Sequence, residues 1–233
     1  MNKDRFIKEV EKLGVEITEK KLEQLEKYYQ LLIEYNKVMN LTGITEKDDV
    51  YLKHFYDSIT IIKIIDLNHE NNLCDLGSGA GFPGIVIKIF YPNLKVTLVD
   101  SLNKRIRFLN TVIKELELKG IEAVHIRIEE YAKNNKEQFD IVTARAVAHL
   151  NILLELGINL VKVEKYFISM KGNIENEQNY ANAIKKLNCS LENIIKFKLP
   201  IEESNRSLIK IKKEKSTLKI FPRKYSEIKK NPL

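Results

Sequence analysis

The sequence predicts an α/β fold in which a mostly parallel sheet carries helices on both faces. From residue 73 onward, short apolar runs of β-forming residues alternate with helical segments, which is the pattern of successive βαβ units. A glycine-rich turn follows the first run and Asp100 follows the second, as expected where strands end at a ligand-binding edge. The expected strands are 73–76, 95–99, 122–126, 139–143 and 165–170, and the expected helices are 85–89, 103–118 and 150–161.

Helical segments are predicted before this region. Apolar residues recur near the helical period from Thr18, a suitable N-cap, to Met39. Asn-Leu-Thr-Gly at 40–43 breaks that helix, and a second helical stretch carries His54 and Ile65. We therefore expect a helical extension over residues 1–70 and one α/β domain over 71–233.

The composition indicates a globular chain with a single substantial core. The 233 residues are 44% hydrophobic, and no apolar run approaches the roughly 20 residues that a membrane span needs. The charged start lacks the apolar core of a signal peptide, so we expect a cytoplasmic protein with no membrane association. Two cysteines without a C-x-x-C pair predict neither a disulfide framework nor a metal site. Nothing in the sequence requires more than a monomer.

The positive charge is concentrated at the C-terminal end. The last sixty residues predict a helix near 180–187 and antiparallel edge strands at 191–199 and 207–213. Residues 206–233 hold ten Lys and Arg against Glu214 and Glu227, so this stretch accounts for the whole net charge of +7. A one-ended basic excess is typical of a surface that contacts a polyanion, although a solvated lysine-rich tail has the same composition.

The glycine-rich turn predicts a cofactor site. It reads Cys-Asp-Leu-Gly-Ser-Gly-Ala-Gly-Phe-Pro-Gly over 74–84, and Gly77, Gly79 and Gly81 let the backbone approach a ligand closely. A dinucleotide loop has the form G-x-G-x-x-G, which the segment satisfies when it is read from Gly79. The negative charge of Asp75 disfavours a pyrophosphate and suits the ammonium and sulfonium of S-adenosylmethionine. We therefore favour the methyl donor over an NAD(P)-dependent oxidoreductase, for which we expect a catalytic Tyr-x-x-x-Lys or His-Asp pair at the ligand edge, because Tyr131-Ala132-Lys133 lacks that spacing.

The residues after the second strand support nucleoside binding. A carboxylate at Asp100 can accept hydrogen bonds from both ribose hydroxyls, and it can also cap the following helix. Lys104 and Arg105 open that helix, where cations oppose the helix dipole. They are candidates to contact RNA phosphates, and exposed ion pairs are the alternative.

The acceptor chemistry is constrained by the residues at the end of the fourth strand. Residues 142–146 lack the Asn/Asp-Pro-Pro-Tyr/Phe motif common in exocyclic amine methylation, and neither Cys74 nor Cys189 has the context of a nucleophile for carbon-5 methylation. Guanine N7 carries a free lone pair and no proton, so positioning alone suffices for its methylation.

Six motifs in order resemble the bacterial 16S ribosomal RNA (guanine-N7) methyltransferases, the glucose-inhibited division protein B family. They are Asn-Leu-Thr at 40–42, His54 with Asp-Ser at 57–58, the glycine loop, Asp-Ser-Leu with Lys-Arg at 100–105, Thr-Ala-Arg-Ala at 143–146 and Phe-Pro-Arg-Lys at 221–224. The resemblance implies a class I S-adenosylmethionine-dependent methyltransferase fold, which is Rossmann-like. It also implies a 16S ribosomal RNA substrate, naked or in the small ribosomal subunit.

The resemblance assigns roles to individual residues. It implies donor contacts at Gly77, Phe82, Ile128, Glu129 and Arg145, to which the loop argument adds Gly79 and Asp100.

Arg145 is expected to bind the donor's carboxylate or an RNA phosphate, and a strand-end ion pair is the alternative. Arg145 and His54 are the catalytic candidates, and no certain catalytic group is identified. Arg223 and Lys224 are candidates for RNA binding, although the ending after them departs from the Gly-Thr-Pro-like stretch of the family.

Overall fold

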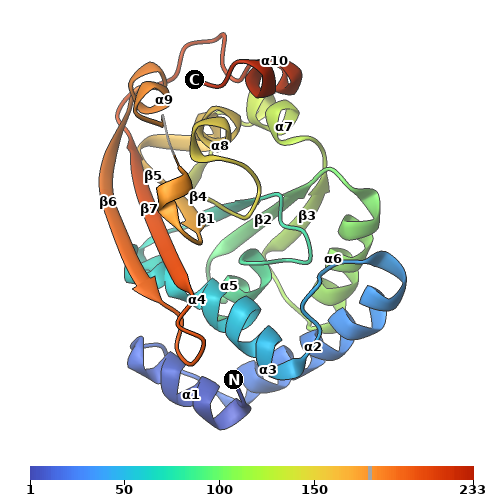
Figure 1. Ribbon diagram of the computed structural model, residues 1–233. Helices are drawn as coiled ribbons and strands as arrows, with labels where there is room; N and C mark the ends of the chain where they lie inside the picture. Colours follow the sequence, from blue (N-terminus) through green and yellow to red (C-terminus); the bar gives the residue numbers. More distant parts are fainter. Residues whose placement is uncertain (178–179) are drawn as a thin grey trace.

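The computed structural model describes residues 1–177 and 180–233 and contains one seven-stranded sheet (Figure 1). The strand order is β3-β2-β1-β4-β5-β7-β6, in which β1 to β5 run parallel and β7 and β6 are antiparallel additions at one edge. The strands are β1 (Asn72–Leu76), β2 (Lys95–Asp100), β3 (Ile121–His125), β4 (Phe139–Arg145), β5 (Val161–Lys171), β6 (Cys189–Lys198) and β7 (Asn205–Lys213). All seven predicted strands are therefore confirmed, with their ends shifted by a few residues.

The two faces of the sheet carry separate hydrophobic cores. One core includes buried residues of α5 (Gly84–Phe90) and α6 (Asn103–Glu115), on which the N-terminal helices pack. The other includes buried residues of α7 (Ile128–Asn134), α8 (Leu150–Gly157) and α9 (Tyr180–Lys186). Because both faces are covered, the strands β1, β2 and β4 consist almost wholly of buried residues, as parallel strands do.

One predicted helix is shorter than its apolar pattern indicated. The expected helix over 150–161 ends at Gly157, and a 3₁₀ turn (Ile158–Leu160) leads directly into β5. Val161 is thus the first residue of a strand, where it is fully buried. A short run of apolar residues fits a buried helix and a buried strand equally well, which explains the difference.

The N-terminal extension is a succession of helices and helical turns. Asn2 and Thr18 accept hydrogen bonds that cap the first two helices, and Asn40 ends the second in a left-handed conformation at φ 50°. The Gln24 side chain donates to the Leu116 carbonyl at 2.9 Å, which ties the extension to the end of α6. The elements are α1 (Lys3–Lys12), α2 (Glu19–Met39), α3 (Lys47–Val50), a π-helical turn (Tyr51–Tyr56), α4 (Asp57–Ile59) and 3₁₀ turns at Thr60–Lys63 and Leu67–His69.

The basic residues at the C-terminal end do not form a free tail. The stretch from residue 205 to 213 is β7, and the chain then returns to pack α10 (Tyr225–Lys230) against α8. Half of its cations are held in ion pairs with acidic residues from elsewhere in the chain or beside it. These pairs are Arg206–Asp57, Lys210–Glu192, Lys212–Glu164, Lys213–Glu137 and Arg223–Glu155. Among the described residues, no helix is long and apolar enough to cross a membrane.

Candidate functional site

A cavity of about 320 Å³ lies at the carboxyl edge of the parallel strands, where α/β sheets bind ligands. The loops after β1, β2, β3 and β4 all reach it, because parallel strands present their carboxyl ends to the same edge. It is called the nucleoside cavity below. Its lining residues are Gly77, Asp100, Ser101, Arg105, Arg127, Ile128, Glu129, Ala146, Val147, Ala148, Leu156 and Tyr225.

The loop after β1 requires glycine where it enters the nucleoside cavity. Gly77 has φ +67°, and a Cβ there would lie 2.7 Å from the Val147 side chain. Its backbone N–H donates to the Val99 carbonyl at 2.8 Å, which folds the loop back over the end of β2. A side chain at Gly77 is therefore excluded by both conformation and space.

Asp100 is held rigidly at the floor of the cavity. Its Oδ2 accepts a hydrogen bond from the Gly79 N–H at 3.0 Å and from Arg105 Nη1 at 3.2 Å, while its Oδ1 accepts from the Leu102 N–H at 2.9 Å. Both sequence interpretations thus have a physical basis, since the carboxylate lines the cavity and also satisfies the turn before α6. Arg105 lies inside the cavity, paired with Asp100, and its contact with RNA stays a prediction.

Ile128 and Glu129 begin α7 and line the same cavity as the glycine loop. An adenosine can use all three groups: a glycine without a Cβ allows close approach, the carboxylate at the strand end can accept from the ribose, and the second carboxylate can accept from the exocyclic amine. The residues present therefore fit the nucleoside half of S-adenosylmethionine.

Asp75 acts differently from the expectation based on its charge. Its carboxylate is fully buried, and Oδ2 accepts a hydrogen bond from the Gly84 N–H at 2.9 Å. Burial raises the pKa of Asp75 from 3.8 to about 7. The side chain is directed at the start of α5 and does not line the cavity, so any influence on a cationic ligand acts through the loop or at a distance.

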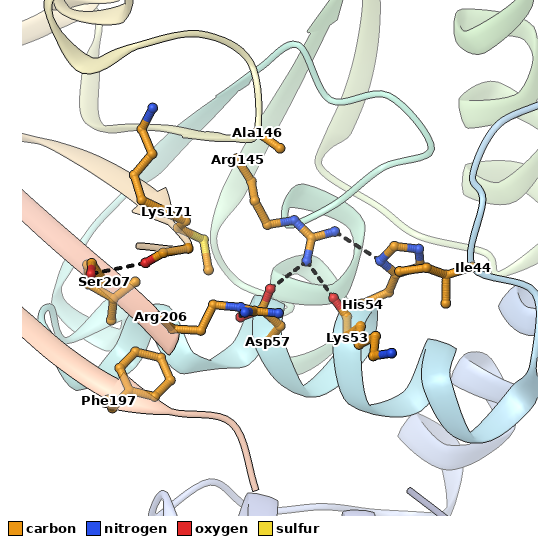
Figure 2. Close-up of a pocket in the computed structure, with 13 residues that line it drawn as sticks. Ile44, Lys53, His54, Asp57, Arg145, Ala146, Lys171, Phe197, Arg206 and Ser207 are labelled. Carbon is orange, nitrogen blue, oxygen red and sulfur yellow. Dashed lines mark hydrogen bonds and ion pairs between the residues drawn. The ribbon is translucent and has the colours of Figure 1, made fainter. Parts of the chain in front are cut away.

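A second cavity of about 300 Å³ adjoins the first at Ala146, which lines both. Ala146 follows β4 and has a positive φ of 57°. Figure 2 shows the cluster of charged side chains that lines this second cavity, called the acceptor cavity below. Its lining residues are Ile44, Lys53, His54, Asp57, Arg145, Ala146, Met170, Lys171, Gly172, Phe197, Arg206, Ser207 and Leu208.

Arg145 is held by the N-terminal extension. Its Nη1 donates to the Lys53 carbonyl at 2.9 Å and to Asp57 Oδ2 at 3.0 Å (Figure 2). The other Asp57 oxygen accepts a hydrogen bond from Arg206 Nε at 3.0 Å. Asp57 therefore bridges β4 and β7, and the ion pair considered as an alternative for Arg145 is present. A contact of Arg145 with the donor or with RNA stays a prediction.

His54 has no nitrogen free to move a proton. Arginine always carries its protons, so His54 Nδ1 accepts from Arg145 Nη2 at 3.3 Å, and Nε2–H then donates to Thr42 Oγ1 at 2.8 Å. Burial and the nearby Arg145 charge lower the pKa of His54 from 6.5 to about 3. The neutral ring stacks on Phe82 with centroids 4.4 Å apart. The arrangement suits His54 to positioning Arg145.

The other predicted residues lie outside both cavities. Phe82 is buried between His54 and Tyr28, and Gly79 lies behind Asp100. Lys104 donates to the Met39 carbonyl at 2.8 Å, and Arg223 binds Glu155. Lys224 is exposed. Their positions do not test the cofactor and RNA roles predicted for these residues, which stay predictions.

Several lining residues were not identified from the sequence. Val147 and Ala148 follow β4 and carry no recognisable motif. Tyr225 and Arg206 reach the cavities from the C-terminal segment and from antiparallel β7. The βαβ pattern does not place those segments at the ligand edge. The positive φ of Ala146 also has no signal in its residue type.

The chain is similar to proteins of one family. The family model described as "GidB: rRNA small subunit methyltransferase G" matches residues 21–209. Relatives named "Ribosomal RNA small subunit methyltransferase G" from Bacillus velezensis and Bacillus subtilis are both 48% identical, over 100% of this chain and 99% of their own length.

Solved structures support the fold. A predicted O-methyltransferase from Agrobacterium tumefaciens matches with a TM-score of 0.55 and 14% identity, over 70% of this chain and 83% of its own. A SAM-dependent methyltransferase from Aquifex aeolicus matches with a TM-score of 0.52 and 14% identity, over 71% of this chain and 93% of its own. Together with the strand order, these likenesses show a class I, Rossmann-like methyltransferase fold.

Proposed function

Because the chain belongs to the GidB family, described as rRNA small subunit methyltransferase G, we propose that it transfers a methyl group from S-adenosylmethionine to N7 of a guanine in 16S ribosomal RNA. The observation that carries this proposal is the pair of adjoining cavities that meet at Ala146. One has the groups for a nucleoside cofactor, and the other is lined by cations that suit a nucleotide of RNA. The NAD(P)-dependent alternative has no support among the relatives, which are named as methyltransferases.

We propose the following cofactor contacts, which are supported by the lining of the nucleoside cavity. The cofactor approaches the backbone of Gly77 closely. The Asp100 carboxylate accepts hydrogen bonds from the ribose hydroxyls, and the Glu129 carboxylate accepts one from the adenine amine. Asp100 already accepts three hydrogen bonds. Its Oδ1 accepts only from the Leu102 N–H and keeps one lone pair for a ribose hydroxyl, whereas Oδ2 accepts from both the Gly79 N–H and Arg105. Arg105 would then release or share its bond to Asp100 when the ribose is bound.

The acceptor cavity fits a reaction that needs no proton transfer. Guanine N7 bonds to the methyl carbon through its own lone pair while the methyl–sulfur bond breaks and leaves its electron pair on sulfur, so no base is required. His54 has both nitrogens occupied, and Asp57 is held between two guanidinium groups. These residues therefore favour N7 over an amine or hydroxyl acceptor, and their task is to place the base in line with the methyl group.

Cations around the cavities favour RNA as the substrate. Arg206, Lys53 and Lys171 line the acceptor cavity, although each also has an acidic partner. Exposed lysines follow in the C-terminal segment, which contributes Tyr225 to the nucleoside cavity. They are Lys215, Lys219, Lys224, Lys229 and Lys230. Such cations bind phosphates without reading base sequence, which fits an enzyme that positions a structured RNA.

The test is transfer of labelled methyl from S-adenosylmethionine to 16S rRNA and to small subunits from a strain that lacks the enzyme. We expect N7-methylguanosine as the labelled nucleoside by mass spectrometry. Asp100→Ala should lower transfer by at least about tenfold through the loss of charge-assisted hydrogen bonds. Lys119→Ala, at an exposed site on the opposite edge of the sheet, is the matched control. Label on another atom, or no transfer to either RNA form, would contradict the proposal.

A further inference from the structure

The C-terminal segment, residues 215–233, is fixed beside the nucleoside cavity by a buried ion pair. Arg223 donates from Nε to Glu155 Oε1 at 2.7 Å and from Nη2 to Oε2 at 2.6 Å, and its backbone N–H donates to Oε1 at 3.2 Å. Glu155 belongs to α8 and is fully buried. The Phe221 carbonyl also accepts a hydrogen bond from the Asn159 side chain at 2.5 Å. The start of α10 is thus held against α8.

Tyr225 follows directly from this anchor and reaches the cavity. It is the first residue of α10, and it lines the nucleoside cavity together with Leu156 of α8. Ile228 lies three residues later, on the same side of the helix as Tyr225, and it is fully buried, which fixes this side of α10 against the protein. The Tyr225 side chain remains 38% exposed, which leaves aromatic surface available at the cavity.

Other lining residues of the cavity supply the groups that fit an adenosine. Ile128 and Glu129 lie at the start of α7, and Asp100 lies at the end of β2. An aromatic ring at such a site adds a flat, polarisable surface that packs on a nucleobase and excludes water from it. No other aromatic residue lines this cavity among the described residues.

We propose that Tyr225 is a cofactor-binding residue that covers the adenosine part of S-adenosylmethionine. The inference rests on the proposed function for the identity of the cofactor. The C-terminal segment is then a wall of the cofactor site, in addition to carrying the exposed lysines proposed for RNA. The Glu155–Arg223 pair is the anchor that holds this wall in place.

The experiment is calorimetric titration of the full chain with S-adenosylhomocysteine and, separately, with adenosine. Tyr225→Ala should weaken binding of both by roughly 5- to 100-fold, the range that base–aromatic stacking supports. Tyr225→Phe keeps the ring and should stay within about twofold of the parent protein. Ile220→Ala changes an apolar residue of the same region that is 66% exposed and does not line the cavity, so it is the matched control.

The outcomes separate this inference from the proposed function. Equal affinity of Tyr225→Ala and the parent protein for both ligands overturns the role of Tyr225 and leaves the methyl donor in place. Absence of binding by the parent protein overturns the proposed cofactor and the inference with it. Tyr225→Leu retains apolar volume without an aromatic face, so its affinity should fall between those of the Ala and Phe variants. Unfolding curves for each variant establish that the comparison is made on folded protein.

Discussion

At the scale of single residues, the acceptor cavity is governed by hydrogen bonds that leave no acid or base free. His54 illustrates this most clearly, because a guanidinium on one side and a threonine hydroxyl on the other fix which nitrogen carries its proton. Its pKa is lowered to about 3, mainly by burial and then by the Arg145 charge. The lowered pKa therefore favours the neutral imidazole at pH 7.

The titration of His54 predicts a pH dependence of stability. The folded-state pKa lies below the ordinary value of 6.5, so its stabilising contribution is complete above pH 6.5 and is lost as the pH falls towards 3. The stability advantage of the parent protein over His54→Gln should shrink by about 2 kcal/mol between pH 8 and pH 5. Urea unfolding of both proteins at the two pH values measures it. An advantage that stays constant or grows towards pH 5 would show that His54 is protonated in the folded protein.

At the scale of elements, α8 joins the nucleoside cavity, the C-terminal segment and the sheet. Its Leu156 lines the nucleoside cavity, its Glu155 anchors the C-terminal segment, and its Gly157 packs closely on the sheet. A Cβ at Gly157 would lie 2.5 Å from the Leu76 side chain and 2.8 Å from the Phe167 ring. Because Gly157 has no side chain, α8 can lie close to β1 and β5.

Gly157→Ala should therefore destabilise the protein by about 1 to 3 kcal/mol, as overpacking of a filled core does. Gly43→Ala is the matched control, since nothing lies within 4 Å of a Cβ at that position. Chemical denaturation of the two variants provides the comparison. If both variants were equally stable, α8 would have to be free to move away from the sheet.

The elements also show what could be predicted from the sequence. The strands and the meeting of Gly77, Asp100 and Glu129 follow from one rule, that parallel strands bring their carboxyl ends to one edge. Tyr225 could not be found this way. Its position depends on the nearby ion pair between Arg223 and the buried Glu155, which are 68 residues apart in the sequence. The ion pairs of β7 were hidden for the same reason, since charge counting along the chain does not reveal partners from distant elements.

At the scale of the whole molecule, Asp57 joins the N-terminal extension to the sheet. Its carboxylate is buried and binds Arg145 at the end of β4 and Arg206 at the start of β7, with both distances 3.0 Å. The extension also reaches the glycine loop, where the Tyr28 hydroxyl donates to the Ala80 carbonyl. Sheet and extension therefore build the acceptor cavity together.

Removal of this carboxylate should loosen the extension. Asp57→Ala leaves two guanidinium groups without their shared partner, and we expect a loss of about 3 kcal/mol in the free energy of unfolding. Methyl transfer should fall more than cofactor affinity, because Asp57 lines the acceptor cavity and does not line the nucleoside cavity. Asp49→Ala, which removes an exposed partner of Lys53, is the control. A parallel loss of cofactor affinity would argue that the two cavities are not independent.

The position of Ala146 between the cavities has an evolutionary consequence. Its backbone is left-handed, so β-branched and bulky residues are disfavoured there by conformation, and any side chain at this position borders both cavities. A residue that lines only one cavity borders only one ligand. Descendants of this protein could thus acquire a different acceptor while retaining the ancestral cofactor, provided that the alanine partition is inherited unchanged.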